Sequence, residues 1–345
     1  MTLAQAFADQ SVSCAKLGSP FMGQLLRQLA EHWPKGGALD AYFDNFSGDL
    51  GPAGASLPLR LAGGLHALVL SGQAPELSSV YPPNTVSDPL LREAVLKSLA
   101  THEAFLLNWV RSAPQTNEVR RSAALMAGAA VARTYSDLPV CLSELGASGG
   151  LNMMWDHFAL ALPNALLGAK NPVLTLSPDW MGALPPLRLP TVAERAGVDL
   201  NPLDPRRDTD LLRMIAYLWP DQPERIERTK AAAKVMDAHI AAGDAIDWLD
   251  NRLDAAPDGH LHLIQHTVAW QYFPPDAQDR GRALIETAGA AATSSRPLAW
   301  LAMETDGDKS GAIGAALTLR FWPGDVRLDL GRVDFHGRWI QWAQV

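Results

Sequence analysis

"LSELGASGGLN", residues 142–152, stands where the sequence changes from helical to strand-like spacing, and it fits two different motifs. Read as E-x-G-x-S-x-G from Glu144 to Gly150, it is a glycine-rich turn in which the backbone can approach a nucleotide-type cofactor. Read as G-x-S-x-G from Gly146 to Gly150, it is a nucleophile elbow with Ser148 as the attacking serine. The first interpretation implies cofactor binding and the second implies nucleophilic catalysis. The rest of the sequence indicates which of the two is better supported.

The composition restricts the classes of protein to consider. The chain has 345 residues, 48% of them hydrophobic, which is enough for one large or two medium domains. A formal net charge of −8 argues against a nucleic acid as the main partner. We therefore expect no nucleic-acid partner, while the sequence leaves the oligomeric state open.

The sequence also suggests a location. Cys14 and Cys141 form neither a disulfide framework nor a metal-binding pair, as is usual in a reducing cytoplasm. The first residues do not resemble a signal peptide, and no apolar run approaches the ~20 residues of a membrane helix. We expect a cytoplasmic protein without a membrane partner.

Up to about residue 135 the apolar residues recur at helical spacing, with breakers between the blocks. The spacing predicts helices over 21–33, 59–72, 88–110 and 117–135. Asp88 is a suitable N-cap, and Pro89 follows it at the first helical position. We expect residues 1–135 to form an all-helical domain or lid.

From residue 138 onward, strand-like runs alternate with helical spacing. Apolar runs of strand length occupy 138–146, 260–268 and 297–306, and a helix is predicted over 275–292. Near the C-terminus two alternating segments flank "PGD", which predicts a hairpin. This alternation predicts an α/β fold over 136–345, with a mostly parallel, Rossmann-like sheet and an antiparallel C-terminal hairpin.

The hydrolase interpretation has some local support. A nucleophile elbow needs a strand before it and an acid and a histidine after it, and Asp199, His266 and His336 all follow Ser148. Hydrolases of that fold, however, place several strands before the elbow, whereas helices are predicted here. The cofactor interpretation also explains Glu144, whose carboxylate at a strand end suits an amino group or a ribose.

The segment "ELGASGGLN" (144–152) resembles the first motif of class I S-adenosylmethionine-dependent methyltransferases. Three later segments are similar to further parts of that fold, in the same order. "GVDLNP" (197–202) resembles the second strand, with its ribose-binding acid at Asp199. "GDAIDWL" (243–249) resembles the segment whose acid faces the adenine. "HLHLIQHTVAW" (260–270) resembles the fourth strand, which ends beside the methyl group.

This resemblance implies a methyltransferase-type sheet and S-adenosylmethionine as the cofactor. It implies that the cofactor is held by Glu144, Gly146, Ser148, Gly150, Asp199 and Asp244. Ser148 stands where the family has its middle glycine, and the 53 residues from Gly146 to Asp199 exceed what one helix needs. An insertion near 160–197 would fill this distance. Alternatively, the second strand is 172–177 and Asp179 holds the ribose.

The whole chain also resembles a bacterial family known only as domain of unknown function 2332. The resemblance is carried by "QTNEVRRS" (115–122), "LGASGGLN" (145–152) and "DLNPLDP" (199–205). It brings no activity, but it implies that the polar loop residues Gln115, Asn117 and Glu118 serve substrate binding. The simpler alternative is that this loop caps the helix that follows it.

Three histidines, His260, His262 and His266, fall on one face of a predicted strand. His260 and His266 would be about 20 Å apart at ~3.3 Å per residue, so the three cannot share an ion, and we expect no metal. His266 would lie at the carboxyl edge of the sheet, where open α/β sheets bind ligands. There it is a candidate general base, and the alternative is a structural histidine.

These features together favour an S-adenosylmethionine-binding protein that transfers a methyl group to a small molecule. Two alternatives stay open. One is a serine hydrolase that uses Ser148, and the other is a scaffold of the same fold that binds a ligand or partner without turnover.

Overall fold

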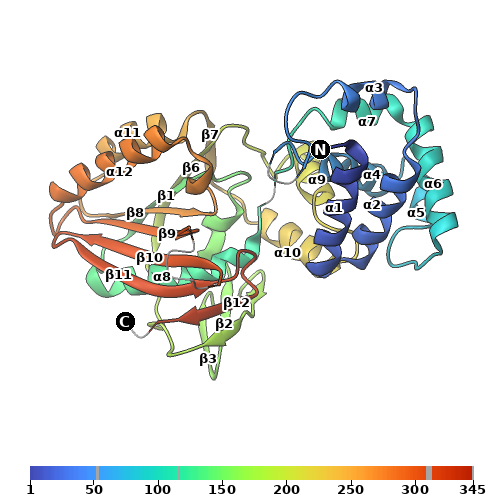
Figure 1. The fold of residues 1–345 in the computed structure, drawn as a ribbon. Helices are drawn as coiled ribbons and strands as arrows, with labels where there is room; N and C mark the ends of the chain where they lie inside the picture. Colours follow the sequence, from blue (N-terminus) through green and yellow to red (C-terminus); the bar gives the residue numbers. More distant parts are fainter. Residues whose placement is uncertain (52–53, 116, 308–312, 344–345) are drawn as a thin grey trace. The chain divides into compact units, whose positions relative to one another are not determined.

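Two compact units make up the structure, a computed structural model that describes residues 1–51, 54–115, 117–307 and 313–343. The helical unit comprises Met1–Thr116 and Arg207–Glu227. The sheet unit comprises Asn117–Arg206 and Arg228–Val345 (Figure 1). The chain thus leaves the helical unit at residue 117, some twenty residues before the boundary expected near residue 136, and returns to it for one segment.

The helical unit is built from α1 (Leu3–Lys16), α2 (Pro20–His32), α3 (Ala38–Asp44), α4 (Leu57–Leu70), α5 (Pro75–Ser78), α6 (Asp88–Thr101), α7 (Glu103–Trp109) and α9 (Asp208–Ala216). α10 (Pro223–Ala233) begins in this unit and ends in the sheet unit. The helix predicted over 88–110 is divided into α6 and α7, because the backbone at His102 departs from helical geometry (φ −113°, ψ 23°). No helix of the described chain is both long enough and apolar enough to cross a lipid bilayer.

Close packing around α4 holds the helical unit together. Gly63 and Gly64 of α4 leave room for large neighbours: a Cβ at Gly63 would lie 2.6 Å from the ring of Tyr217, and one at Gly64 would lie 2.9 Å from Leu106. Tyr217 follows α9 and packs with Trp109 in a buried cluster. The returning segment 207–227 therefore completes the core of this unit.

A nine-stranded sheet forms the body of the sheet unit, in the order β7-β6-β1-β8-β9-β10-β11-β12-β5. The strands are β1 (Val140–Leu145), β5 (Asp179–Met181), β6 (Val192–Asp199), β7 (His239–Ala242), β8 (Leu261–Thr267), β9 (Leu298–Glu304), β10 (Ala315–Trp322), β11 (Val326–Val333) and β12 (Trp339–Trp342). The five strands from β7 to β9 are parallel, and β10, β11 and β12 continue antiparallel. This confirms the predicted α/β fold with a mostly parallel sheet and antiparallel C-terminal strands.

Helices cover both faces of this sheet (Figure 1). On one face, α11 (Ala245–Asp254) and α12 (Pro275–Ala290) bury apolar side chains against β1 and β8. On the other face lies α8 (Ser122–Tyr135), where a Cβ at Gly128 would be 2.4 Å from Leu301 of β9. All six residues of β1 are buried, as is typical of a central parallel strand with both faces covered.

Several short elements complete the sheet unit. A three-stranded sheet has the order β3-β2-β4, from β2 (Ala159–Leu162), β3 (Ala165–Gly168) and β4 (Thr175–Leu176). Three short 3-10 helices are η1 (Val119–Arg121), η2 (Leu151–His157) and η3 (Trp270–Tyr272). The helix predicted over 117–135 is therefore η1 followed by α8. Most of this small sheet occupies the stretch where the sequence suggested an insertion.

Candidate functional site

The strand order reverses beside β1, which lies between β6 and β8. After β1 the chain forms β6 and then β7 on one side of it. The next strands, β8 and β9, lie on the other side of β1. Open α/β sheets bind ligands in the crevice at the carboxyl ends of the strands at such a reversal. The residues that end or follow β1, β6, β7 and β8 are therefore the candidates for a site.

The glycine-rich turn follows β1 directly and leads into η2. Gly146, Ser148 and Gly150 all have a positive φ, at 67°, 53° and 72°. A Cβ at Gly146 would lie 2.6 Å from the methyl group of Ala269, and one at Gly150 would lie 2.6 Å from the methyl group of Met236. The two glycines are therefore required by the backbone conformation and by neighbouring side chains of the protein itself.

Side chains from two distant segments hold this turn in place. Asp199, at the end of β6, accepts a hydrogen bond from the Ser148 N–H through Oδ2 at 2.9 Å. Asn117, which precedes η1, accepts one from the Leu151 N–H through Oδ1 at 2.9 Å. The three stretches that carry the resemblance to the bacterial family therefore meet at one turn.

The polar loop before η1 acts largely within the protein. Asn117 and Glu118 are buried, and Glu118 accepts a hydrogen bond from the Arg120 N–H at 3.2 Å, which caps η1. Gln115 belongs to the helical unit, where it is half-buried. The contact of Glu118 corresponds to the simpler of the two expectations, a loop that caps the helix after it, whereas Asn117 binds the segment after the glycine-rich turn.

Glu144 of β1 is almost completely buried, with 2% of its surface exposed. It is aligned with Gln265 of β8, and its Oε2 has no hydrogen-bond partner among the described residues. Burial raises the pKa of Glu144 to about 8, although the hydrogen bond with Gln265 and the charge of Arg121 act in the opposite direction. The carboxyl group is therefore mostly protonated at neutral pH, and a cationic ligand beside it would favour the ionised form.

Gln265 connects the surroundings of Glu144 to η2. Its Oε1 accepts a hydrogen bond from Nε1 of Trp155 at 3.1 Å, and its Nε2 donates to the carbonyl of Asn152 at 3.5 Å. The side chain of Asn152 in turn accepts a hydrogen bond from Ser122 of α8 at 2.9 Å. A continuous polar network thus fixes the wall beside Glu144.

Two aspartates lie at the carboxyl edge of the sheet, where Asp199 ends β6 and Asp244 follows the neighbouring strand β7. Asp199 uses Oδ1 to accept a second backbone N–H, from Asn201, at 2.9 Å. Asp244 is the N-cap of α11 and accepts two backbone N–H groups of its first turn, at 2.8 and 3.0 Å. Asp179, the alternative ribose-binding acid, begins β5, which pairs with β12 at the far edge of the sheet. Of these two candidates, Asp199 is the one that contacts the glycine-rich turn.

His266, the predicted general base, lies on β8 with 1% of its surface exposed. Its Nδ1 is 2.7 Å from Oε1 of Glu304, and its Nε2 is 2.8 Å from Nε1 of Trp300. An indole N–H can only donate, so Nε2 is an acceptor and the neutral ring carries its proton on Nδ1. Both ring nitrogens are used within the protein, which favours a structural role for His266 over that of a base.

Glu304, at the end of β9, holds the segment that follows β8. Its Oε1 accepts hydrogen bonds from His266 and from the N–H groups of Ala269 (2.9 Å) and Trp270 (3.1 Å). Burial alone would raise the pKa of Glu304, but the hydrogen bonds from His266 and the two N–H groups lower it below the ordinary value. The sequence interpretation missed Glu304, although an acid at the carboxyl end of a strand is the signal that identified Asp199.

Glu144 and Glu304 face opposite sides of the sheet. Side chains alternate along a strand, so Gln265 and His266 of β8 point to different faces. Glu144 lies with Gln265 on the side of η2. Glu304 lies with His266, whose ring stacks on that of Trp270 with 5.1 Å between the ring centroids.

The Ser148 hydroxyl is also buried without a hydrogen-bond partner among the described residues. Asp199 binds the backbone N–H of Ser148 and not its hydroxyl, and His266 is occupied by Glu304 and Trp300. No His, Cys, Asp or Glu side chains of the described chain gather in a group of three that could hold a metal ion.

Comparison with known proteins identifies the family. Residues 4–342 match a family described as an uncharacterized protein conserved in bacteria, DUF2332. The match spans nearly the whole chain, and the protein belongs to this family. No curated protein matches the sequence. The family description assigns no activity, so the function has to be argued from the site.

Proposed function

We propose that the sheet unit binds S-adenosylmethionine around the glycine-rich turn and transfers its methyl group to a small molecule. The observation that carries this proposal is Glu144, a buried carboxyl group at the point where the strand order reverses, with one oxygen that has no hydrogen-bond partner in the described part of the chain. Buried polar atoms are normally hydrogen-bonded, so this oxygen suits a donor supplied by a ligand. The ammonium group of the cofactor's amino-acid part is such a donor.

The two aspartates suit the remaining parts of the cofactor. Asp199 accepts the backbone N–H groups of Ser148 and Asn201, and a carboxylate oxygen can accept more than one hydrogen bond, so this acid also suits a ribose hydroxyl. Asp244 follows the next strand and can accept the adenine amino group. Glu144, Asp199 and Asp244 lie at or just after the ends of three adjacent strands, β1, β6 and β7. A ligand that carries its ammonium, ribose and adenine groups in this order could therefore contact the three acids one after another.

When bound, S-adenosylmethionine supplies a methyl group on a positively charged sulfur, which an acceptor atom can attack. The contribution of the chain is then mainly the positioning of the two reactants. For His266 to take a proton from the acceptor, its hydrogen bond from Trp300 would have to break. We therefore assign His266 and Glu304 to holding Ala269 against the glycine-rich turn.

Calorimetric titration with S-adenosylhomocysteine tests the proposal. The wild type should bind, and Glu144→Gln should bind at least tenfold more weakly, because it loses a charge-assisted hydrogen bond worth about 1.5–3 kcal/mol. Glu31→Gln is the matched control, since it removes the same charge from an exposed side chain of the helical unit. Its affinity should equal that of the wild type.

Absence of binding by the wild type, to either S-adenosylmethionine or S-adenosylhomocysteine at millimolar concentration, would refute the proposal. Binding without methyl transfer to any tested small molecule would instead support the non-catalytic scaffold.

A further inference from the structure

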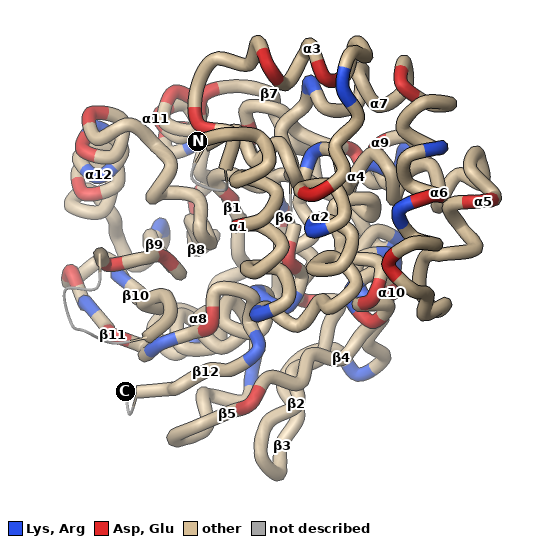
Figure 2. The backbone as a smooth tube through the Cα atoms, turned by 45° about the vertical axis from the view of Figure 1, so that its right-hand side comes forward, with Lys and Arg blue, Asp and Glu red and all other residues tan. Residues whose placement is uncertain are grey.

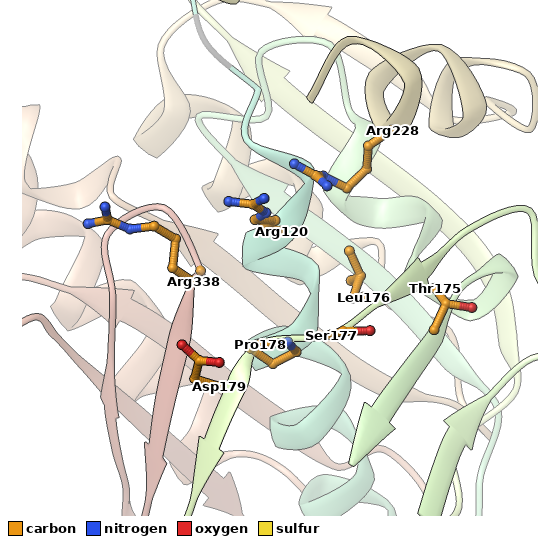
Figure 3. A pocket seen from close by; sticks show the side chains of 9 residues that line it. Arg120, Thr175, Leu176, Ser177, Pro178, Asp179, Arg228 and Arg338 are labelled. Atoms are coloured by element: carbon orange, nitrogen blue, oxygen red, sulfur yellow. The ribbon is translucent and has the colours of Figure 1, made fainter. Parts of the chain in front are cut away.

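One pocket of the sheet unit, shown in Figure 3, is lined by three arginines, Arg120, Arg228 and Arg338. Their charges are already engaged within the protein. Asp334 accepts hydrogen bonds from Nη2 of Arg338 at 2.7 Å and from its Nε at 2.8 Å. Arg120 and Arg228 also have interaction partners. These arginines therefore do not identify a ligand.

A second pocket, with a volume of about 470 Å³, lies on the face of the sheet formed by β9, β10 and β11, beside α12. Volumes above roughly 300 Å³ are typical of sites for small molecules. Residues opposite each other on neighbouring strands share a face of the sheet, and here they form two rows across the three strands. The first row is Trp300, Arg320 and Arg327, and the second row is Ala302, Thr318 and Asp329.

The first row is filled by large side chains whose charges are paired. Arg320 pairs with Glu286 of α12 and with Asp325 in the turn after β10. Nη2 of Arg327 donates to Oδ2 of the same Asp325 at 3.0 Å. These two arginines and two acids have no net charge together. The first row therefore presents the half-buried indole of Trp300 beside a neutral set of ion pairs.

The second row leaves the hollow, because the side chains of Ala302 and Thr318 are small. Asp329 of β11 lies at one end of this row. Its Oδ1 accepts the N–H of Gly331 at 3.0 Å, and it forms no ion pair with a described residue. Arg282 of α12 lines the other side of the pocket, and among the residues that the structure describes its guanidinium has neither a hydrogen bond nor an ion pair.

The course of α12 places Arg282 beside the second row. This helix begins after β8 and ends before β9, so it runs in the opposite direction to β9. Glu286 lies one turn after Arg282 on the same side of α12 and reaches Arg320 in the first row. Four residues rise about 6 Å along a helix, close to the ~6.6 Å of two strand residues that separates the rows. Asp329 lies two strands beyond β9, or roughly 10 Å across the sheet, so the two charges face each other over the hollow.

We propose that this pocket binds a small zwitterion that has a carboxylate at one end, an ammonium group at the other and an apolar chain between them. The guanidinium of Arg282 binds the carboxylate, and Asp329 binds the ammonium group. The apolar chain lies over Ala302 and Thr318, against the indole of Trp300. A simple anion would leave Asp329 without a cation, and a simple cation would leave Arg282 without an anion.

The surroundings of the pocket agree with a ligand of no net charge. Figure 2 shows acidic and basic residues together on α12 and near β10 and β11. Nε1 of Trp300 donates to Nε2 of His266 at 2.8 Å, which fixes the indole before a ligand binds. A preformed wall reduces the conformational entropy that binding costs. The argument for this pocket does not depend on the methyl-transfer proposal.

Calorimetric titration with ε-aminocaproate tests the pocket. Caproate, which lacks the ammonium group, and hexylamine, which lacks the carboxylate, are the comparators. The wild type should bind ε-aminocaproate about threefold to fivefold more tightly than either comparator, the range expected for one exposed charge pair. Potassium chloride should weaken the binding of ε-aminocaproate, because salt screens both charge pairs.

Two substitutions separate the ends of the pocket. Arg282→Gln should weaken binding of ε-aminocaproate about threefold to fivefold and leave that of hexylamine unchanged. Asp329→Asn should weaken binding of ε-aminocaproate to a similar degree and leave that of caproate unchanged. Both side chains are exposed, so both variants should fold. Arg188→Gln removes a charge from an exposed position that does not line the pocket, and it should bind like the wild type.

Thr318→Tyr fills the hollow with a side chain that strands favour, and it should abolish binding of all three compounds. Equal affinity of the wild type for ε-aminocaproate and caproate overturns the proposal. Unchanged affinity for ε-aminocaproate in Arg282→Gln and Asp329→Asn overturns it as well. The titrations contain no S-adenosylmethionine, so their failure and the failure of the methyl-transfer proposal are separate results.

Discussion

Glu144 and Glu304 are acids of the parallel sheet, one buried and the other with a side chain 12% exposed, but their surroundings affect their charge in opposite ways. Burial raises the pKa of Glu144 to about 8. The pKa of Glu304 is lowered, because three hydrogen bonds from His266 and two backbone N–H groups outweigh the effect of burial. The charge of a buried acid is thus decided by the donors around it, and not by burial alone.

The source of these donors distinguishes the two roles. The three donors of Glu304 belong to the protein and all bind its Oε1, so this oxygen has a structural role, while its Oε2, like that of Glu144, has no hydrogen-bond partner among the described residues. The main neighbour of Glu144 is Gln265, which already binds Trp155 and Asn152. Glu144 therefore lacks a donor that a ligand can supply. Five substitutions test or sharpen this contrast.

Glu304→Ala should have the largest effect. It leaves the imidazole N–H of His266 and the N–H groups of Ala269 and Trp270 without their acceptor, and breaking such a buried network costs about 3–5 kcal/mol. Urea denaturation at pH 7 measures the loss in the free energy of unfolding. A loss below about 1 kcal/mol would show that Glu304 does not organise this segment.

Between about pH 4.5 and pH 8, the free energy of unfolding of the wild type should fall by roughly 2–4 kcal/mol relative to that of Glu144→Gln. The raised pKa means that the folded state keeps the proton more tightly than the unfolded state. This contribution is complete below the ordinary pKa of about 4.5 and is lost as the pH rises to about 8. The wild type should therefore lose stability relative to Glu144→Gln across this range.

Urea denaturation of both proteins at pH 4.5, 6 and 8 measures this difference. Parallel curves for the two proteins would mean that Glu144 is ionised in the folded state, and the contrast with Glu304 would disappear. The same substitution is expected to weaken ligand binding, so stability and affinity should change in opposite directions.

Asp199→Ala tests an acid of intermediate character, whose two oxygens each accept a backbone N–H. Affinity for S-adenosylhomocysteine should fall at least tenfold, because hydrogen bonds to a charged acceptor contribute about 1.5–3 kcal/mol. Asp244→Ala should weaken binding less and lose about 1 kcal/mol of stability as a lost N-cap. Calorimetric titration of both variants would contradict this order if Asp244→Ala bound more weakly than Asp199→Ala.

Ser148→Gly should have the smallest effect, although the Ser148 hydroxyl is buried and without a partner like Oε2 of Glu144. Glycine adopts the φ of 53° more easily than serine, so stability should change by less than about 1 kcal/mol. Ligand affinity should be preserved, and a fluorophosphonate probe should leave the wild type unlabelled. Labelling at Ser148 would favour the serine hydrolase.

The elements around the site could be predicted because their signals are local. β1 (VCLSEL) is a short, largely apolar segment of strand length that ends at the glycine-rich turn, and β8 (LHLIQHT) is a second strand-length segment with apolar residues at its centre. The resemblance of 197–202 to a second strand agrees with β6, which ends at Asp199. Each signal lies within about ten residues, the range over which periodicity and turn chemistry operate.

The partners of the site residues could not be predicted in the same way. His266 and Glu304 are 38 residues apart, and their contact depends on the pairing of β8 with β9. The sequence indicates that His266 ends a strand, but not that Trp300 occupies its second nitrogen. Similarly, the sequence of α9 does not indicate that this helix packs into the core of the helical unit, beside Tyr217 and Trp109.

The return of 207–227 to the helical unit has a consequence for protein synthesis. His66 of α4 faces the carbonyl of Ala216 at 3.2 Å, and Ser19 donates a hydrogen bond to Asp221. The ribosome makes α8, β1 and β6 before it makes these partners, so the helical unit stays incomplete while the sheet unit begins to form. Its apolar surface around Gly63 is exposed during that interval, when nascent chains aggregate or bind chaperones. A chain that stops at residue 116 would keep this surface exposed permanently.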